Sequence, residues 1–231
     1  AVGGYALDAN TTADNNVGVG YGALGANTTG ANNTAVGNYA LDAATTADDN
    51  TAFGYVALSE NTTGTRNVAV GTYSLDANTT ASNNVAVGYG TLGVNTTSGN
   101  NVAVGYNALT LNTGADNTAV GAYSLDANTT AISNTAVGKA ALGANTTGSY
   151  NVAVGQNAGL NNTTAADITA IGYGALQANT TANSNTGVGT NALNANTTGT
   201  ANVAVGRRAL YVSTTGDYNT AVGYNALDAN T

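Results

Sequence analysis

The stretch Asn-Thr-Ala-Val-Gly-Tyr-Asn-Ala-Leu, at Asn219 to Leu227, is one copy of a unit that recurs along the whole chain. The glycine that closes its Ala-Val-Gly core returns every 17 residues, with a single interval of 16 between Gly105 and Gly121. These glycines are Gly3, Gly20, Gly37, Gly54, Gly71, Gly88, Gly105, Gly121, Gly138, Gly155, Gly172, Gly189, Gly206 and Gly223. A short fixed period of this kind is typical of a solenoid or a fibre.

The composition indicates ordered repeats and excludes several classes of function. Only 7% of the residues are charged, and Pro, Cys, Met, Trp and His are absent. Disordered chains normally carry more charge or proline and lack regular apolar spacing, so the spacing here predicts order. A net charge of −8, with Arg66, Lys139 and the pair Arg207-Arg208 as the cationic side chains, argues against a nucleic-acid partner. No apolar run approaches the roughly 18 residues of a membrane helix, so we expect no membrane insertion in this segment.

Alternation along the unit predicts a short strand with two different faces. We number the unit from its asparagine, so that the glycine stands at the fifth place. Val and Thr at the second and fourth places are good strand formers and share one face. The third place lies on the other face and is always Ala, except at Gly18 and Gly187, which predicts a tight contact there. The alternation does not decide which face points into the coil.

A second apolar element, Ala-Leu, and two files of asparagine complete the unit. The leucine is missing at Gly159, where Leu160 comes one place late. One asparagine file precedes the strand and is broken by Ile168; the other precedes Thr-Thr and is broken by Ala44 and Ser213. Stacked asparagines can hydrogen-bond along a ladder, and asparagine tolerates the left-handed backbone of sharp corners. Both properties suit a coil with two corners.

A two-unit rhythm overlies the first. Tyrosine alternates between the seventh place, as in Tyr39, and the sixth, as in Tyr55. Asp42 accompanies the first arrangement, and Gly25 replaces the aspartate in the second. We interpret the alternation as spacing that keeps bulky rings and carboxylates two strands apart, about 10 Å. The short unit, Asn101 to Asp116, lacks one threonine, which predicts a surface turn there.

Together these patterns predict an all-β fold, a parallel β-solenoid (β-roll) of about fourteen 17-residue coils forming a single array over residues 1–231. At about 4.8 Å per coil the rod would be on the order of 65 Å long. One Val and one Leu per coil bury little apolar surface against the entropy of ordering the chain. We therefore expect lateral association, most simply a parallel homotrimer. Both ends fall within a unit and no capping repeat is visible, so we expect a segment of a longer fibre.

The segments Asn67 to Ser74, Asn84 to Thr91 and Asn151 to Ala158 resemble the head repeats of trimeric autotransporter adhesins of the YadA type. The longer repeat, in the units that begin at Asn33, Asn50 and Asn219, is similar to repeats in phage tail fibres and related long bacterial surface proteins. The resemblance implies a parallel β-roll trimer with a fibrous role, located outside the cell, at the cell surface or on a virion. Adhesin heads have a shorter unit, so the extra residues are expected in an outer turn.

Few residues could carry chemistry. The chain has one lysine, Lys139, and one glutamate, Glu60, and we interpret the pair Asp48-Asp49 as a solvated turn. The Gly-x-Gly-x-Gly run that ends at Gly22 is the repeat with glycine in place of alanine, not a phosphate loop. Aspartates are too sporadic for a calcium-binding β-roll. We expect no enzyme activity, cofactor or metal, and the sequence leaves any binding residues unassigned.

The Asn-Thr-Thr corner is formally an N-glycosylation sequon. It occurs at Asn10, Asn27, Asn61, Asn78, Asn95, Asn128, Asn145, Asn162, Asn179 and Asn196. Glycans about 4.8 Å apart would collide, which favours a structural corner, with partial glycosylation as the alternative. Adjacent threonines should point to opposite sides, which predicts one outward file and makes ice binding a weaker hypothesis.

The sequence therefore predicts a non-enzymatic structural and adhesive segment, the shaft or head of a surface adhesin or phage tail fibre. We expect partnership with further copies of the chain and, externally, with a cell-surface receptor or glycan. The main alternative is a homopolymeric extracellular filament without a dedicated receptor, and ice binding is the less favoured one.

Overall fold

The computed structural model describes residues 1–229, and all of their regular secondary structure is strand. The strands are β1 (Val17–Val19), β2 (Thr34–Val36), β3 (Thr51–Phe53), β4 (Val68–Val70), β5 (Val85–Val87), β6 (Val102–Val104), β7 (Thr118–Val120), β8 (Thr135–Val137), β9 (Val152–Val154), β10 (Thr169–Ile171), β11 (Thr186–Val188), β12 (Val203–Val205) and β13 (Thr220–Val222). The predicted parallel β-solenoid with a 17-residue repeat is confirmed, with about 12 turns. The first expected coil contributes only an isolated bridge, between Val2 and Val19.

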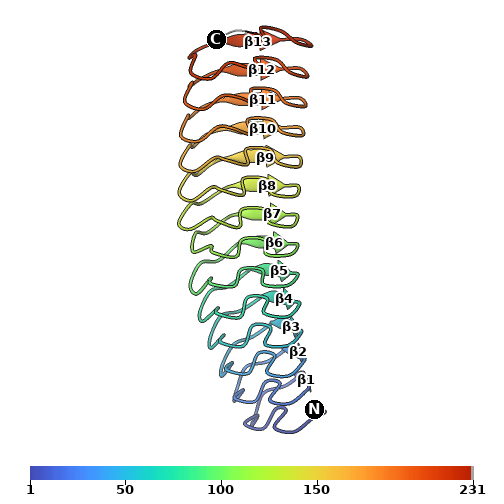
Figure 1. Cartoon of the computed structure of the whole chain (residues 1–231). Helices are drawn as coiled ribbons and strands as arrows, with labels where there is room; N and C mark the ends of the chain where they lie inside the picture. The colour runs from blue at the N-terminus through green and yellow to red at the C-terminus, as the bar shows by residue number, and fades with distance from the viewer. Residues whose placement is uncertain (230–231) are drawn as a thin grey trace. The chain divides into compact units, whose positions relative to one another are not determined.

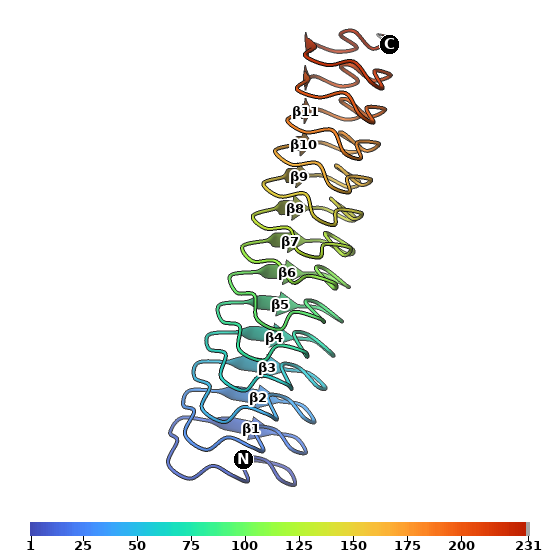
Figure 2. The same cartoon turned by 90° about the vertical axis from the view of Figure 1, so that its left-hand side faces the viewer.

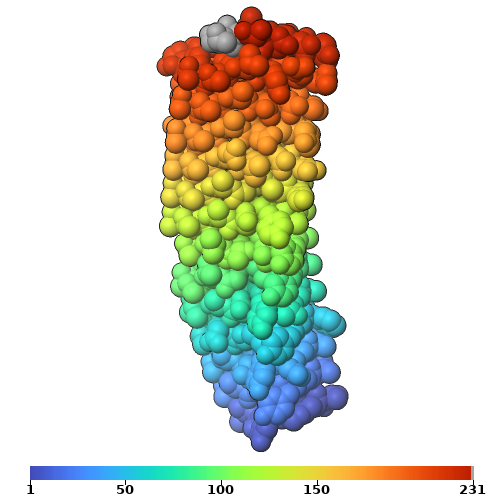
Figure 3. Space-filling model, viewed as in Figure 1, coloured from blue at the N-terminus to red at the C-terminus, as the bar shows by residue number. Residues whose placement is uncertain are grey.

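The chain divides into two compact units, Ala1–Ala115 and Asp116–Thr231. The first contains β1 to β6 and the second β7 to β13, and the boundary falls at the end of the short repeat. Within each unit every strand pairs in parallel with the next, and identical places face each other, as Ala35 faces Ala52. Figures 1 and 2 show the coils of each unit lying one upon the next, and Figure 3 shows them in close contact. Each unit has the architecture that the sequence predicted for a single array.

Hydrogen bonds between coils continue around the turns. The backbone N–H of Leu24 donates to the carbonyl of Ala40 at 3.1 Å, and that of Thr28 donates to Thr45 at 3.0 Å. Strands of three residues would leave most of each coil unpaired, and unpaired buried backbone groups are costly. The turns avoid that cost because each coil is a template for the next over most of its circumference.

The two strand faces are now assigned. Ala153 is fully buried, whereas Val152 and Val154 on either side of it are 37% and 38% exposed. The third place therefore points into the coil and the Val/Thr face points outward. The predicted tight contact is also confirmed, because a Cβ added to Gly18 would lie 3.2 Å from Cγ of Leu7. The interior has room for a methyl group at this place and for nothing larger.

Asparagines share the interior with the leucines, and both asparagine files form ladders. In the first file, Nδ2 of Asn67 donates to the carbonyl of Ala81 at 2.8 Å, and its Oδ1 accepts the backbone N–H of Asn84 at 3.0 Å. In the second, Nδ2 of Asn78 donates to Oδ1 of Asn61 at 2.8 Å. The four asparagines and Ala81 are all buried, so the amides satisfy polar groups that water cannot reach.

The left-handed backbone expected at the two asparagine files lies elsewhere. Neither file has a positive φ; the positive values fall at the fifth, seventh, ninth and last places of the unit. The ninth place is leucine, with φ near +53° at Leu24 and Leu41. Left-handed backbone at such a residue costs about 1–2 kcal/mol. Leucine adopts it in coil after coil because the conformation directs its side chain into the core. The prediction that the asparagines of the two files take the left-handed backbone is therefore wrong.

Each break in the second ladder leaves one buried acceptor without a partner. Among the described residues, Oδ1 of Asn27 and Oδ1 of Asn196 receive no hydrogen bond. The next place along the ladder is Ala44 after the first and Ser213 after the second. Oδ1 of Asn95, the last residue of this ladder before the short repeat, is in the same situation. The irregular residues therefore have a structural cost in the coil before them, and at the second break the buried hydroxyl of Ser213 is itself without a partner.

Restoring the ladder should stabilise the protein. In Ala44→Asn, the new amide is placed to donate to Asn27 Oδ1, and its own oxygen to accept from Asn61. Because a buried polar atom without a partner costs about 1–3 kcal/mol, we expect the free energy of unfolding to rise by about 1–2 kcal/mol in urea titration. Ala43→Asn, next to the ladder but half-exposed, is the control and should change little. If Ala44→Asn destabilised the protein and Ala43→Asn did not, the missing ladder donor would not be the cause of the unpaired Asn27 oxygen.

The missing leucine at Gly159 and the missing asparagine at Ile168 are related, because the two residues pack together. A Cβ added to Gly159 would lie 3.6 Å from Cδ1 of Ile168, so the isoleucine extends into the space beside the missing leucine. The backbone N–H of Ile168 still donates to Oδ1 of Asn151 at 3.0 Å. The chain thus loses a leucine and an asparagine in adjacent coils, and one apolar side chain compensates for the leucine.

Candidate functional site

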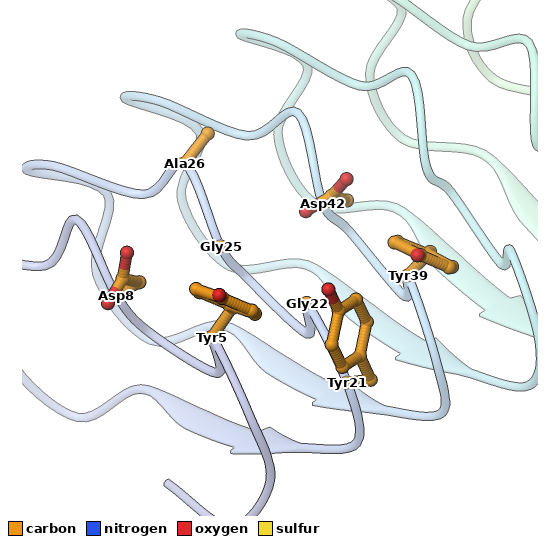
Figure 4. Close-up of a pocket in the computed structure, with 8 residues that line it drawn as sticks. All are labelled: Tyr5, Asp8, Tyr21, Gly22, Gly25, Ala26, Tyr39 and Asp42. Atoms are coloured by element: carbon orange, nitrogen blue, oxygen red, sulfur yellow. The ribbon is translucent and has the colours of Figure 1, made fainter.

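The two-unit rhythm builds a groove on the first unit, with a volume of about 420 Å³. Figure 4 shows the side chains that line it. They are Tyr5, Asp8, Tyr21, Gly22, Gly25, Ala26, Tyr39 and Asp42. The sequence had left binding residues unassigned, so this groove is the candidate site that the structure adds.

The groove exists because the middle of three coils lacks two side chains. Tyr39 and Asp42 occupy the seventh and tenth places of their coil, where the middle coil has Gly22 and Gly25. A Cβ on Gly22 would lie 3.1 Å from Cδ1 of Tyr39, and one on Gly25 would lie 2.8 Å from Oδ1 of Asp42. The glycines therefore leave the room into which the ring and the carboxylate extend.

The tyrosines are in contact, which corrects the interpretation that alternation keeps them apart. The ring of Tyr21 lies 5.4 Å from those of Tyr5 and Tyr39, at interplanar angles of 80° and 74°. Shifting between the sixth and seventh places lets rings on consecutive coils pack edge to face, a favourable arrangement. Where consecutive coils both use the sixth place, at Tyr89 and Tyr106, the rings stack instead, with centroids 5.5 Å apart and planes at 11°.

The groove is anionic. Burial, and next the negative charge of Glu60, raise the pKa of the Asp42 carboxyl. The arginines interact with other side chains: Nε of Arg66 donates to Asn83 at 2.8 Å, and Arg207 and Arg208 lie over the rings of Tyr224 and Tyr211. None of the residues that line the groove is basic.

The half-buried aspartates predict stabilisation by mild acid. Burial raises the pKa of Asp42, Asp76 and Asp126, with Glu60 contributing at the first two. A raised folded pKa gives stability that is fully present below the ordinary aspartate pKa of about 4 and is lost as the pH rises through the raised pKa. Asp217 opposes this, because hydrogen bonds from Thr200 lower its pKa, but that carboxyl is fully exposed.

We therefore expect the melting temperature, followed by circular dichroism, to rise as the pH is lowered from 7 towards about 4. A variant with asparagine at positions 42, 76 and 126 should lose most of this dependence. A wild-type protein that melts earlier at pH 4.5 than at pH 7 would show that other carboxylates dominate.

The acidic pair Asp48-Asp49 accepts hydrogen bonds from the preceding coil. Oδ1 of Asp48 accepts the backbone N–H of Ala31 at 2.7 Å, and Oδ1 of Asp49 accepts Nδ2 of Asn32 at 3.2 Å. Glu60 and Lys139 are exposed, and the glycine run ending at Gly22 belongs to β1 and its following turn. Within residues 1–229 no three acidic side chains come together as metal ligands would.

The Asn-Thr-Thr corners are structural. Every sequon asparagine named above is fully buried except Asn10, which is half-buried. A buried amide that donates within a ladder cannot carry a glycan in the folded protein, so the structural interpretation is favoured. The hydroxyl of Thr28 donates to the carbonyl of Thr45 at 3.0 Å, whereas Thr29 is exposed. The corner thus presents one outward threonine file, as predicted.

Over the described residues, the structure has no helix with the length and hydropathy that a membrane crossing requires. Comparison with protein-family models, with curated proteins and with solved structures gives no match.

Proposed function

We propose that this chain is a non-enzymatic structural and adhesive segment of an extracellular fibre, located at a cell surface or on a virion. In-register stacking supports the proposal, because each added coil lengthens a unit by about 4.8 Å while repeating the same core residues. Such a stack projects whatever it carries away from a particle or cell. The YadA-type and tail-fibre resemblance of the repeats favours the same role, with a cell-surface receptor or glycan as the external partner.

The observation that carries the proposal is the outward face of the strands. From β1 to β13 its residues are Val, Thr, Ile or Phe, with no charge. Ile171 and Val205 are each 37% exposed and Phe53 is 56% exposed. Within each unit the fourth place of every strand is apolar, and exposed apolar strips of this kind are uncommon on monomers and mark interaction surfaces. We propose that further copies of the chain cover this face, in a parallel homotrimer.

Sedimentation equilibrium of the purified chain tests the association. A trimer has three times the 22.5 kDa of one chain. Val154→Lys should dissociate it, because a lysine would place a charge in the contact. Thr147→Lys, at an exposed turn position in the same unit, is the matched control and should leave it intact. A monomer at micromolar concentration would overturn the trimer, and a mass that keeps rising with concentration would favour the homopolymeric filament.

Ice binding is a second candidate, which the exposed threonine file represented by Thr29 favours. The neighbouring Thr28 hydroxyl is already used between coils, so the corner offers a single file and this candidate is the weaker one. Thermal hysteresis of the purified chain decides it: measurable hysteresis that Thr29→Lys and Thr46→Lys reduce would support ice binding, and its absence would remove it.

A further inference from the structure

We propose that the groove between Tyr5 and Asp42 binds an alkylammonium group, as found in the lysine side chain and in choline-like compounds. The proposal does not depend on the fibre role or on the trimer, since every residue involved lies in one unit of one chain.

The chemistry of the lining favours an organic cation. Asp8 and Asp42 supply two carboxylates, and Tyr5, Tyr21 and Tyr39 supply three aromatic rings. Aromatic faces attract ammonium groups through the ring quadrupole, and several rings around one site are the arrangement that recognises methylated ammonium. The groove itself offers no positive side chain that would neutralise the carboxylates.

The spacing excludes a simple metal site. Asp8 and Asp42 stand on coils two strand spacings apart, about 10 Å. A calcium ion requires its oxygen ligands at about 2.3–2.6 Å, so the two carboxylates cannot share one ion. An alkylammonium group has an apolar stem as well as a charge and can use a wider site. In Figure 4 the carboxylates lie beside the rings of Tyr5 and Tyr39, with Tyr21 between the two tyrosines.

The position of Asp42 suits an interaction with a cation. Its carboxyl is held over Gly22 and Gly25, and burial with Glu60 nearby raises its pKa. A bound ammonium group would favour the charged form and lower that pKa again. Binding should therefore weaken as the pH falls far enough to protonate Asp42.

The second unit provides a matched site that is closed. Asp126, Gly143 and Leu160 hold the tenth place in consecutive coils, as Asp8, Gly25 and Asp42 do in the groove, so Leu160 stands where the groove has Asp42. A Cβ on Gly143 would lie 3.2 Å from Cδ1 of Leu160, so an apolar side chain occupies the corresponding space. The late leucine that interrupts the repeat thus closes this copy of the groove. Asp126 is half-buried with a raised pKa, which makes it a close control for Asp42.

The test is an NMR titration of the whole chain at low salt with butylammonium, choline and the uncharged choline analogue 3,3-dimethylbutan-1-ol. We expect both cations to shift resonances of the groove tyrosines and the neutral analogue not to. Asp42→Asn and Tyr21→Leu should each weaken binding about three- to fivefold, as exposed ion pairs and cation–π contacts do. Tyr21→Phe keeps the ring and so separates the contribution of the aromatic face from that of the hydroxyl, and Asp126→Asn should leave binding unchanged.

Circular dichroism of each variant separates loss of binding from loss of folding. Asp42→Asn should fold, because burial already disfavours the charge that it removes. Tighter binding of choline would identify a quaternary ammonium compound as the natural class, and tighter binding of butylammonium a lysine side chain of a partner. Equal binding of the neutral analogue, equal weakening by Asp126→Asn, or no shift with either cation would each overturn the proposal.

Discussion

Replacing Gly121 with alanine is expected to lower the free energy of unfolding by at least about 3 kcal/mol. Gly121 has a φ of +137°, a backbone conformation that is essentially restricted to glycine. An added Cβ would lie 2.5 Å from the carbonyl oxygen and 2.6 Å from the carbonyl carbon of Gly138 in the next coil. That neighbour cannot move away, because its own N–H donates to Val120 at 2.7 Å. Urea unfolding followed by circular dichroism gives the change.

Gly143→Ala is the matched control for this substitution. Gly143 lies in the same unit without a positive φ, and the nearest atom to an added Cβ is a flexible leucine methyl. We expect this variant to lie within about 1 kcal/mol of the wild type, as most substitutions without strain do. Equal costs at the two positions would mean that the fifth-place glycine is not set by contact with the next coil.

Asn67→Ala is expected to cost about 2–4 kcal/mol, the second large effect. The amide of Asn67 donates to Ala81, and its oxygen accepts the backbone N–H of Asn84, all without access to water. Alanine would leave the N–H of Asn84 buried without a partner and would open a cavity beside it. The measurement is again the midpoint and slope of urea unfolding.

An exposed asparagine of the same unit provides the comparison. Nδ2 of Asn83 donates to Oδ1 of Asn100 at 3.3 Å on the surface, and Asn83 has a φ of +63°. Asn83→Gly removes the side chain without imposing backbone strain, so we expect a loss below about 1 kcal/mol. If the two variants lost equal stability, the asparagine ladders would not be the internal support that we assign to them.

Much of the fold could be predicted because the period alone places like residues on like residues. The 17-residue spacing predicted parallel in-register strands, and Ala35 facing Ala52 is an instance of it. Alternation could not say which face is inside, and ordinary hydrophobicity would place valine there. The coil is too narrow for that: its interior already holds leucine and two asparagines, so only alanine fits at the third place.

The groove could not be predicted, because it depends on the direction of side chains at a strained place. Tyr39 has a φ of +58°, which turns its ring towards the coil before it. Glycine at the same place in other coils, as at Gly22 and Gly90, was the available indication of a positive φ. Because the positive φ at this place was not predicted, the alternation of tyrosine was interpreted as keeping the rings apart, whereas the rings are in contact.

Disulfide cross-linking tests most directly whether each 17-residue turn lies on the next. The chain contains no cysteine, so Thr29→Cys/Thr46→Cys introduces a single pair at the same exposed place of adjacent coils. Adjacent coils lie about 4.8 Å apart, within the Cα separation of a disulfide. We predict rapid oxidation to an intrachain disulfide, and none for Thr29→Cys/Thr63→Cys, whose partners are two coils apart. Cross-linking of the second pair as fast as the first, or of neither, would contradict the stacked solenoid.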